Sequence, residues 1–177
     1  MFSRKNMEFS INIREAQFSD IEQICLIQES SQNSQDILTR EILEERIRNF
    51  ADTFLLASLN EQGIAYISAT ILTNDSLDKW IVTISKEDFR RDNAIILEEI
   101  SVHPDFQKQG FGTLLLASLK EVACQKNSPA IYLLCKDELL SYFEMNGFLE
   151  QGIVEGERSS EVAFLMCWRN PFYQEEL

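Results

Sequence analysis

Alternating apolar and polar residues predict strands along most of the chain. Phe9, Ile11 and Ile13 alternate with polar neighbours, which is the period of a half-buried strand. Apolar runs bounded by turn residues predict further strands at 54–59, 64–72, 95–102, 130–135, 148–154 and 161–168. The sequence Asn-Glu-Gln-Gly at 60–63 predicts a hairpin turn between the second and third strands.

Apolar residues at helical spacing predict helices at about 20–29, 40–50, 111–125 and 138–146. Ser19 followed by Glu22 is typical of a capping box, and Thr39 is a suitable N-cap for the second helix. Gly147 follows the last helix as a C-cap residue. Helices and strands thus alternate in a pattern typical of a single α/β (α+β) domain that spans 1–177.

Residues 73–93 interrupt this pattern with about twenty residues that predict no regular element. The segment is acidic but also contains Trp80, Ile81, Val82, Ile84 and Phe89. Long segments between strands of a compact domain are usually functional or disordered. Two interpretations stay open, a flap over an acceptor site and a mere surface insertion.

Composition narrows the function. A formal net charge of −13 disfavours nucleic acid and anionic membranes as partners, and it would attract cations such as an amine. Solubility alone is an equally good reason for such a charge. The chain has a single histidine, so we expect no histidine-based metal site.

The N-terminal residues and the cysteines indicate a cytoplasmic protein. No apolar stretch follows Arg4 and Lys5, as a signal peptide would require, and no apolar run approaches the length of a membrane span. The four cysteines are scattered, which is typical of reduced and mostly buried thiols: Cys25, Cys124, Cys135 and Cys167.

The most informative stretch runs from Leu97 to Thr113. A strand ends in Val-His-Pro, and Gln107-x-x-Gly110-x-Gly112 then leads into a helix. A glycine loop at a helix N-terminus presents unpaired N–H groups at the positive end of the helix dipole, which suits a phosphate or pyrophosphate. Neither the Walker loop nor the dinucleotide fingerprint fits. The alternative interpretation is a structural turn without a ligand.

This string resembles the signature of the GNAT acetyltransferase superfamily, a strand ending in Val-x-Pro followed by Gln/Arg-x-x-Gly-x-Gly/Ala and a helix. Residues 131–148, which end in Gly147-Phe148, resemble the second conserved block of that superfamily. The Leu-x-Cys-x-x-x-Leu pattern at 133–139 and the long insertion look most like the arylalkylamine N-acetyltransferase-like branch. The resemblance covers about residues 9–169.

The resemblance implies a mixed, mostly antiparallel sheet of six to seven strands with helices on both faces. The glycine-loop strand and the next strand would splay apart. It also implies transfer of an acetyl group from acetyl-CoA to a primary amine by direct attack. The acceptor would be a small arylalkylamine or polyamine, and the protein a monomer or homodimer.

Backbone groups would hold the co-substrate in such a protein. Those of Ile100, Ser101 and Val102 would bind the pantetheine arm and polarise the thioester carbonyl. The N–H groups that would hold the pyrophosphate belong to Gln107, Lys108, Gln109, Gly110, Phe111, Gly112 and Thr113. Two other interpretations stay open, a catalytically weak acetyl-CoA-binding module and a peptide N-terminal acetyltransferase.

Glu98 is the predicted base or amine anchor. An ammonium must lose a proton before it attacks, and polyamine-type members of the superfamily have a glutamate at this point. Strand alternation would place Glu98 on the face shared by Ile100 and Val102 and turn Glu99 the other way. The alternative for Glu98 is an exposed charge at the strand end. His103 matches a His-Pro that family members carry without a catalytic role.

Tyr142 is the second candidate catalytic residue. In the superfamily, a tyrosine that is second in a Phe-Tyr pair protonates the leaving thiolate. Here the order is Tyr142-Phe143, so the matching position is a phenylalanine, which cannot donate a proton. Neighbours on a helix do not share a face, so Tyr142 is expected to point elsewhere, and a core role is its alternative. Water or Cys135 could donate the proton instead.

Overall fold

The computed structural model describes residues 10–31, 37–72, 93–155 and 162–175. Within them the strands form one seven-stranded sheet in the order β1-β2-β3-β4-β5-β7-β6. The strands are β1 (Ile11–Glu15), β2 (Phe54–Leu59), β3 (Gln62–Ile71), β4 (Ile95–Val102), β5 (Ala130–Cys135), β6 (Leu149–Glu155) and β7 (Val162–Arg169). The pairing is antiparallel except between β4 and β5. The predicted fold class is confirmed.

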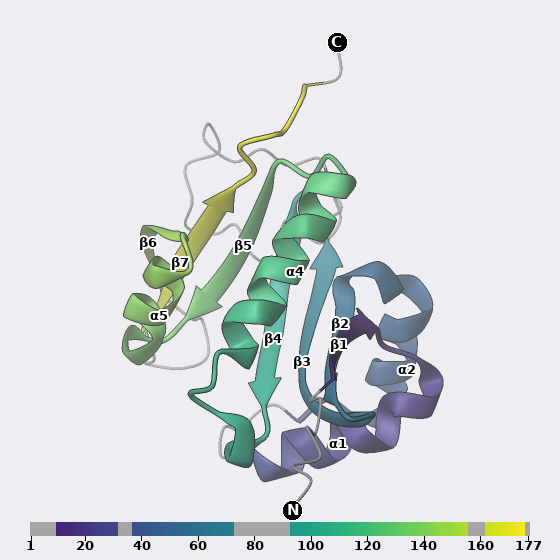
Figure 1. The fold of residues 1–177 in the computed structure, drawn as a ribbon. Coiled ribbons are helices and arrows are strands. Elements are labelled where there is room, and N and C mark those ends of the chain that lie inside the picture. Colours follow the sequence, from purple (N-terminus) through teal and green to yellow (C-terminus); the bar gives the residue numbers. More distant parts are fainter. Residues whose placement is uncertain (1–9, 32–36, 73–92, 156–161, 176–177) are drawn as a thin grey trace, which may run out of the picture.

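Helices cover both faces of the sheet (Figure 1). They are α1 (Ile21–Ser30), α2 (Arg40–Asn49), α4 (Phe111–Gln125) and α5 (Leu140–Met145). Leu55 and Ala57 of β2 belong to the core cluster that contains α4, whereas Phe54 and Leu56 pack with α1 and α2. Because successive strand residues point to opposite faces, these two helical layers lie on opposite sides of the sheet.

Local signals place most element ends correctly. The Thr39 hydroxyl accepts a hydrogen bond from the Ile42 N–H, as an N-cap does, and Gly147 has φ +79° just beyond α5. The capping box at Ser19 is wrong, because a 3₁₀ turn (Phe18–Asp20) precedes α1 and puts Asp20 at its N-cap. The hairpin turn uses Asn60 and Glu61, both at positive φ, and β3 already begins at the next residue.

Two irregularities of β4 create the functional cleft. The first is its short pairing with β5, which covers only Ile95 with Ile131 and Ile96 with Tyr132. Beyond Ile96 the two strands diverge, so the rest of the β4 edge on that side has no strand partner among the described residues, and the predicted splay is confirmed. The second is a register shift against β3, discussed below.

The predicted insertion at 73–93 lies outside the described residues apart from Asn93. Asn93 adopts φ +63° immediately before β4. Its carbonyl accepts a hydrogen bond from the Ser128 hydroxyl at 2.7 Å. The start of β4 is therefore tied to the segment that leads into β5.

Candidate functional site

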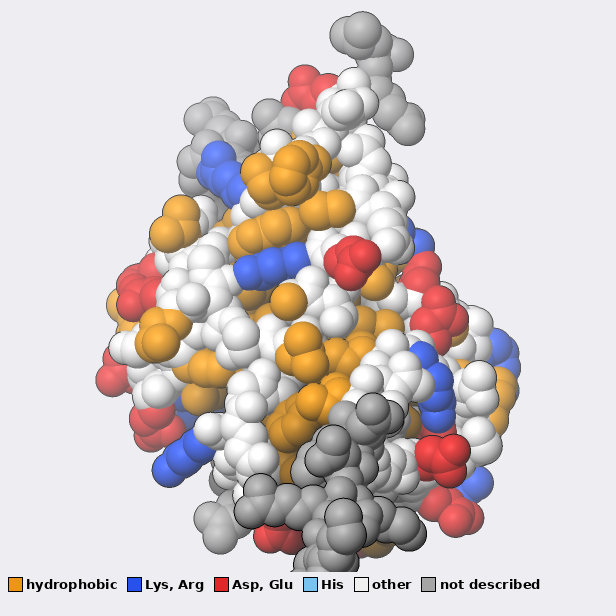
Figure 2. Space-filling model, viewed as in Figure 1, with side chains coloured by type: hydrophobic (Ala, Val, Ile, Leu, Met, Phe, Trp, Pro, Cys, Tyr) orange, Lys and Arg blue, Asp and Glu red, His pale blue; other side chains and the backbone are white. Residues whose placement is uncertain are grey.

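A cleft of about 660 Å³ opens where β4 separates from β5. Residues 98–102 of β4 line its floor, Arg46 of α2 lines one side, and Gly112, Tyr142 and Phe143 line the other. We call this the central cleft. On the face in view in Figure 2, apolar side chains gather over α4 and its flanks, whereas most acidic side chains lie towards the rim.

A smaller hollow of about 280 Å³ adjoins the central cleft at the start of α4. We call it the loop pocket, and its lining includes Gln107, Lys108 and residues 110–113. Gly110 is the N-cap of α4 with φ +89°, a conformation that favours glycine. The first N–H groups of α4 have no acceptor within the helix and point to its positive end. This loop therefore fits an oxyanion such as a pyrophosphate.

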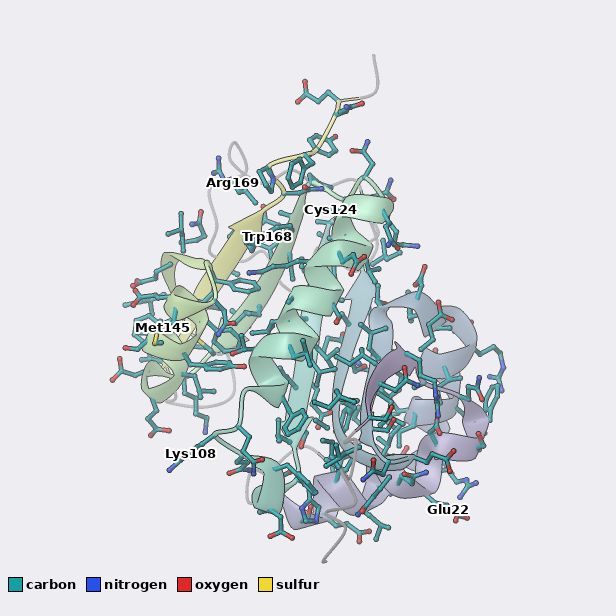
Figure 3. All side chains as sticks on the ribbon, viewed as in Figure 1. Glu22, Lys108, Cys124, Met145, Trp168 and Arg169 are labelled. Carbon is teal, nitrogen blue, oxygen red and sulfur yellow. The ribbon has the colours of Figure 1, made fainter. Side chains whose placement is uncertain are left out.

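The side chains of two loop residues whose N–H groups were predicted to bind the pyrophosphate point away from it. Lys108 lines the loop pocket, but its side chain extends outwards from the loop (Figure 3). Gln109 does not line either pocket, and its Nε2 donates to the Asp105 carbonyl at 2.9 Å. Gln107 instead folds back, and its Nε2 donates to the Val102 carbonyl at 3.0 Å. Gln107 therefore fixes the loop to the end of β4.

The open edge of β4 presents backbone groups of alternate residues. The His103 N–H donates to the Ile64 carbonyl of β3 at 2.9 Å. Because alternate residues of a strand direct their hydrogen-bonding groups to the same neighbour, Ser101 also faces β3. Ile100 and Val102 then direct their N–H and C=O groups towards the open edge, where the Val102 carbonyl accepts the hydrogen bond from Gln107. This arrangement can bind an extended, amide-containing arm in the way that a further strand would.

The predicted orientation of the two glutamates of β4 is wrong. Ser68 pairs with Glu99 and Ala69 with Leu97, so Glu98 is an extra residue in a β-bulge. The bulge breaks strict alternation, and Ile100 and Val102 pack on the α4 face. Glu98 faces the other way, towards α2. Glu99, expected to point away from Glu98, lies on that same α2 side.

Each glutamate has a distinct partner. The Glu98 carboxylate forms an ion pair with Arg46 and accepts a hydrogen bond from the Thr70 hydroxyl at 3.3 Å. Glu99 accepts a short hydrogen bond from the Tyr66 hydroxyl. Burial and the negative charge of Glu99 raise the pKa of Tyr66 far above its usual range, so Tyr66 stays a hydrogen-bond donor. The central cleft therefore has two carboxylates with different surroundings.

The position of Tyr142 beside Phe143 in the helix predicted that its side chain points away from the cleft, and this prediction is wrong. Tyr142 lines both the central cleft and the loop pocket. Burial raises the pKa of the Tyr142 hydroxyl, and a hydrogen bond with the Thr113 side chain lowers it by a smaller amount. Phe143 also lines the central cleft, but it is 4% exposed and packs edge-on against Phe148. Tyr142 is thus the α5 side chain that can present a proton at the junction of the two pockets.

The remaining candidates have structural roles. His103 caps the short turn Pro104–Phe106, where its Nδ1 accepts a hydrogen bond from the Asp105 N–H at 3.3 Å. Cys135 is buried in the core beside α4 and lines neither pocket, and burial raises the pKa of its thiol. Within the described part of the chain, no cluster of histidine, cysteine and acidic residues could hold a metal ion.

The sequence analysis assigned no chemical role to three residues that the structure brings together: Arg46, Tyr66 and Glu99. Arg46 looks like one of several charges on an amphipathic helix, and Tyr66 looks like core. Only the pairing of β3 with β4 and the docking of α2 bring Arg46 and Glu99 to the cleft and Tyr66 into contact with Glu99. The Glu-Glu doublet in an otherwise apolar strand was the one available signal, because two successive charges are hard to fit into regular alternation.

Comparisons with known proteins agree with this geometry. The chain is 35% identical over 57 residues to a glucosamine 6-phosphate N-acetyltransferase of Schizosaccharomyces pombe, a match that covers 32% of this chain and 51% of that protein. The chain thus matches about half the length of that curated relative. No helix among the described residues has the length and apolar content needed to cross a membrane.

Solved structures share the whole fold at low sequence identity. The ribosomal-protein-S18-alanine N-acetyltransferase of Escherichia coli superposes with a TM-score of 0.68 at 17% identity, over 95% of this chain and 99% of that one. The PaiA N-acetyltransferase of Thermoplasma acidophilum, solved with coenzyme A, gives 0.66 at 18% identity, over 90% and 99% of the two chains. The model of the acetyltransferase (GNAT) family matches residues 16–148. The chain therefore belongs to the acetyltransferase (GNAT) family.

Proposed function

We propose that this protein is an acetyl-CoA-dependent N-acetyltransferase that acetylates the primary amine of a small acceptor. The observation that supports this most is the meeting of three features in one cleft. They are the open edge of β4, the N-terminus of α4 and the carboxylates of Glu98 and Glu99. The open edge of β4 would hold an extended arm, the N-terminus of α4 an oxyanion, and the two carboxylates an ammonium ion.

The co-substrate would lie along the loop pocket and the open edge of β4. The N–H groups of residues 107–113 would bind its pyrophosphate, and the backbone at Ile100 and Val102 would bind the pantetheine arm and polarise the thioester carbonyl. Such contacts act by positioning and by electrostatic stabilisation, so they depend on backbone geometry more than on side-chain chemistry. Gly112 suits this role because it has no side chain to fill the space between α4 and α5.

The acceptor amine would enter on the α2 side of the central cleft. We assign the removal of its proton to the two β4 carboxylates, directly or through water. Glu98 was the base expected from sequence, but Arg46 already pairs with its carboxylate. Glu99 lines the same cleft and accepts a hydrogen bond from the Tyr66 hydroxyl. Because the ion pair with Arg46 already engages Glu98, we favour Glu99 as the base.

The leaving group would depart towards Tyr142. After one ammonium proton has passed to the carboxylate, nitrogen attack forms the new C–N bond, the C–S bond breaks, and the thiolate takes a proton from Tyr142. The second proton that the nitrogen loses then restores the Tyr142 hydroxyl. Tyr142 is available as the donor because burial raises its pKa and keeps the hydroxyl protonated. Tyr142 would thus take the role of the superfamily tyrosine whose matching position in this chain is Phe143, one residue later.

The alternative functions differ in the acceptor that each would acetylate, or in having none. Resemblance to the arylalkylamine-like branch and the acidic residues support an arylalkylamine or a polyamine. The E. coli relative is named as a ribosomal-protein alanine acetyltransferase, which supports a peptide N-terminus as a second acceptor class. The displacement of the usual tyrosine supports a catalytically weak acetyl-CoA-binding module as the non-enzymatic alternative.

Steady-state release of coenzyme A tests the proposal. The acceptor panel would contain 2-phenylethylamine, spermidine, glucosamine 6-phosphate and a peptide with N-terminal alanine, with acetyl-CoA affinity measured by calorimetry. We expect acetyl-CoA to bind and at least one free amine to be acetylated above background. Binding without turnover of any acceptor would identify a binding module, and acetylation of the peptide alone would identify an N-terminal acetyltransferase.

A further inference from the structure

Arg46 is the one cationic side chain among the described residues that line the central cleft. It comes from α2, and its side chain is 16% exposed. Its Nη1 donates to the Ser68 hydroxyl at 2.8 Å and pairs with the Glu98 carboxylate. These two contacts fix one corner of the planar guanidinium, so the orientation of the whole fork is set before any ligand arrives.

The rest of that fork is available. Arg46 has no hydrogen bond to a described residue beyond those of Nη1, so its Nε and Nη2 groups have no protein partner in the described part of the chain. Two adjacent N–H groups in this geometry match the paired oxygens of a carboxylate or phosphate.

The register of β3 and β4 places this cation next to the proposed base. Ser68, which anchors Arg46, is directly opposite Glu99 in the ladder, and directly opposite residues have Cβ atoms about 4.5–5.5 Å apart. A positive and a negative binding group are therefore side by side at the acceptor end of the cleft.

Ser101 adds a second polar group to the central cleft. It is 8% exposed, it lines the cleft, and its hydroxyl makes no hydrogen bond with any residue that the structure describes. A buried hydroxyl left without a partner costs about 1–3 kcal/mol. In the ladder Ser101 is opposite Tyr66, two pairs along from Glu99 and on the same face. Its position indicates a polar acceptor in this part of the cleft rather than a purely hydrocarbon one.

We infer that Arg46 binds an oxyanion of the acceptor, so that the substrate is an amine with a carboxylate or phosphate close to the nitrogen. This inference rests on the proposed function and narrows it. Glu98 then acts as a positioning residue that holds the guanidinium, while Glu99 takes the ammonium. Simple arylalkylamines and polyamines lack the oxyanion and use only half of this site.

Matched acceptor pairs test the inference without requiring turnover. Calorimetry would measure the binding of L-phenylalanine against 2-phenylethylamine and L-phenylalaninamide, and of O-phosphoethanolamine against ethanolamine. Each titration is made with and without saturating coenzyme A. We expect the oxyanion to increase affinity on the order of 10- to 100-fold, the range of a charge-assisted hydrogen-bonded pair. The first set reports a carboxylate and the second a phosphate.

Variants of α2 assign the effect to one side chain. Arg46→Gln should remove the preference within each pair, and Arg46→Lys should restore only part of it, because a point charge lacks the fork. Arg40 is the matched control. It lies on the same helix, its side chain is 58% exposed, and it pairs with Glu44 outside the cleft. Arg40→Gln should leave every affinity unchanged, and coenzyme A affinity should be equal in all variants.

Each outcome has a defined meaning. Equal affinity within both pairs, or a preference that survives in Arg46→Gln, overturns the inference even if amines are acetylated. No measurable binding of any oxyanion-bearing amine overturns it as well. A preference that depends on Arg46, without acetylation of any amine, supports the anion site and overturns the proposed enzymatic activity instead.

Discussion

The hydroxyl of Tyr142 occupies the space in which a side chain at Gly112 would begin. A Cβ atom at residue 112 would lie 2.5 Å from Tyr142 Oη but 3.5 Å from Cζ. Gly112 therefore leaves at the start of α4 the space that the Tyr142 hydroxyl of α5 fills. This contact lies at the junction of the central cleft and the loop pocket, so it joins the two parts of the proposed co-substrate site.

The Gly112–Tyr142 contact predicts non-additive substitutions. Gly112→Ala alone should destabilise the protein and weaken acetyl-CoA binding, because the methyl group must displace the Tyr142 hydroxyl. In the Tyr142→Phe background the same alanine meets only the ring carbon at ordinary contact distance, so its cost should shrink. Thermal unfolding and acetyl-CoA calorimetry of the four proteins would give a coupling of about 0.5–3 kcal/mol. Strictly additive effects would show that the contact is absent in solution.

The two β4 carboxylates should separate in a pH–rate profile. Glu99→Gln should lower kcat/KM by roughly 10²–10⁴-fold, as expected of a lost general base, and remove its acidic limb. Glu98→Gln should act mainly on acceptor KM, because it loosens Arg46. Exposed Glu22 of α1, which lies at the rim in Figure 3, provides a control in Glu22→Gln. Loss of the acidic limb in Glu98→Gln alone would assign the base to Glu98, as sequence analysis expected.

Substitution of Gly110 should be unfavourable because of its backbone conformation, and not because a side chain would meet neighbouring atoms. A Cβ there would have no heavy atom of the described part of the chain within 4 Å, yet φ is +89°. Gly110→Val should cost about 1–2 kcal/mol of stability and a corresponding part of acetyl-CoA affinity, because a β-branched residue avoids this region. Gly110→Asn should be tolerated better, since asparagine enters the left-handed region more readily. Equal losses in both variants would point to a steric cause.

Stability should depend on pH through Asp20, which is 3% exposed. The Arg14 guanidinium, above all through hydrogen bonds, holds the pKa of this carboxyl below its ordinary value of 3.8. A depressed pKa stabilises the fold above that value, and the contribution is lost as pH falls through the lower folded pKa. Asp20→Asn should therefore cost about 1–2 kcal/mol near neutral pH, reduced by the exposure of Arg14, and progressively less in acid.

Urea unfolding measured from neutral pH into acid would check the Asp20 prediction. The control is Glu44→Gln, which removes the exposed partner of Arg40. An exposed pair of this kind contributes only about 0.3–0.5 kcal/mol, so the control should differ little from the wild type at any pH. A difference between Asp20→Asn and the wild type that stays constant into acid would show that the carboxylate charge is not its cause.

Much of the fold could be predicted because its signals are local. Hydrophobic periodicity, the Thr39 cap and Gly147 depend on residues a few positions apart, and they appear where expected. The glycine loop is also local, since Gly110 must adopt its conformation wherever α4 lies. By contrast, the element at Ser19 shifted by one residue because Asp20 pairs with Arg14 of β1, a contact that periodicity cannot reveal.

Sequence by itself determined the order of elements, the glycine turn before α4 and the membership of the chain in a family with this motif. Only the tertiary structure decided which side chains meet at the acceptor end. A single bulge in β4 turned Glu98 away from Ile100, brought Glu99 onto the same side, and gave both to α2. The physical reason is that strand alternation holds only while the ladder is regular, and the bulge arises from pairing with β3, a strand some thirty residues away in the chain.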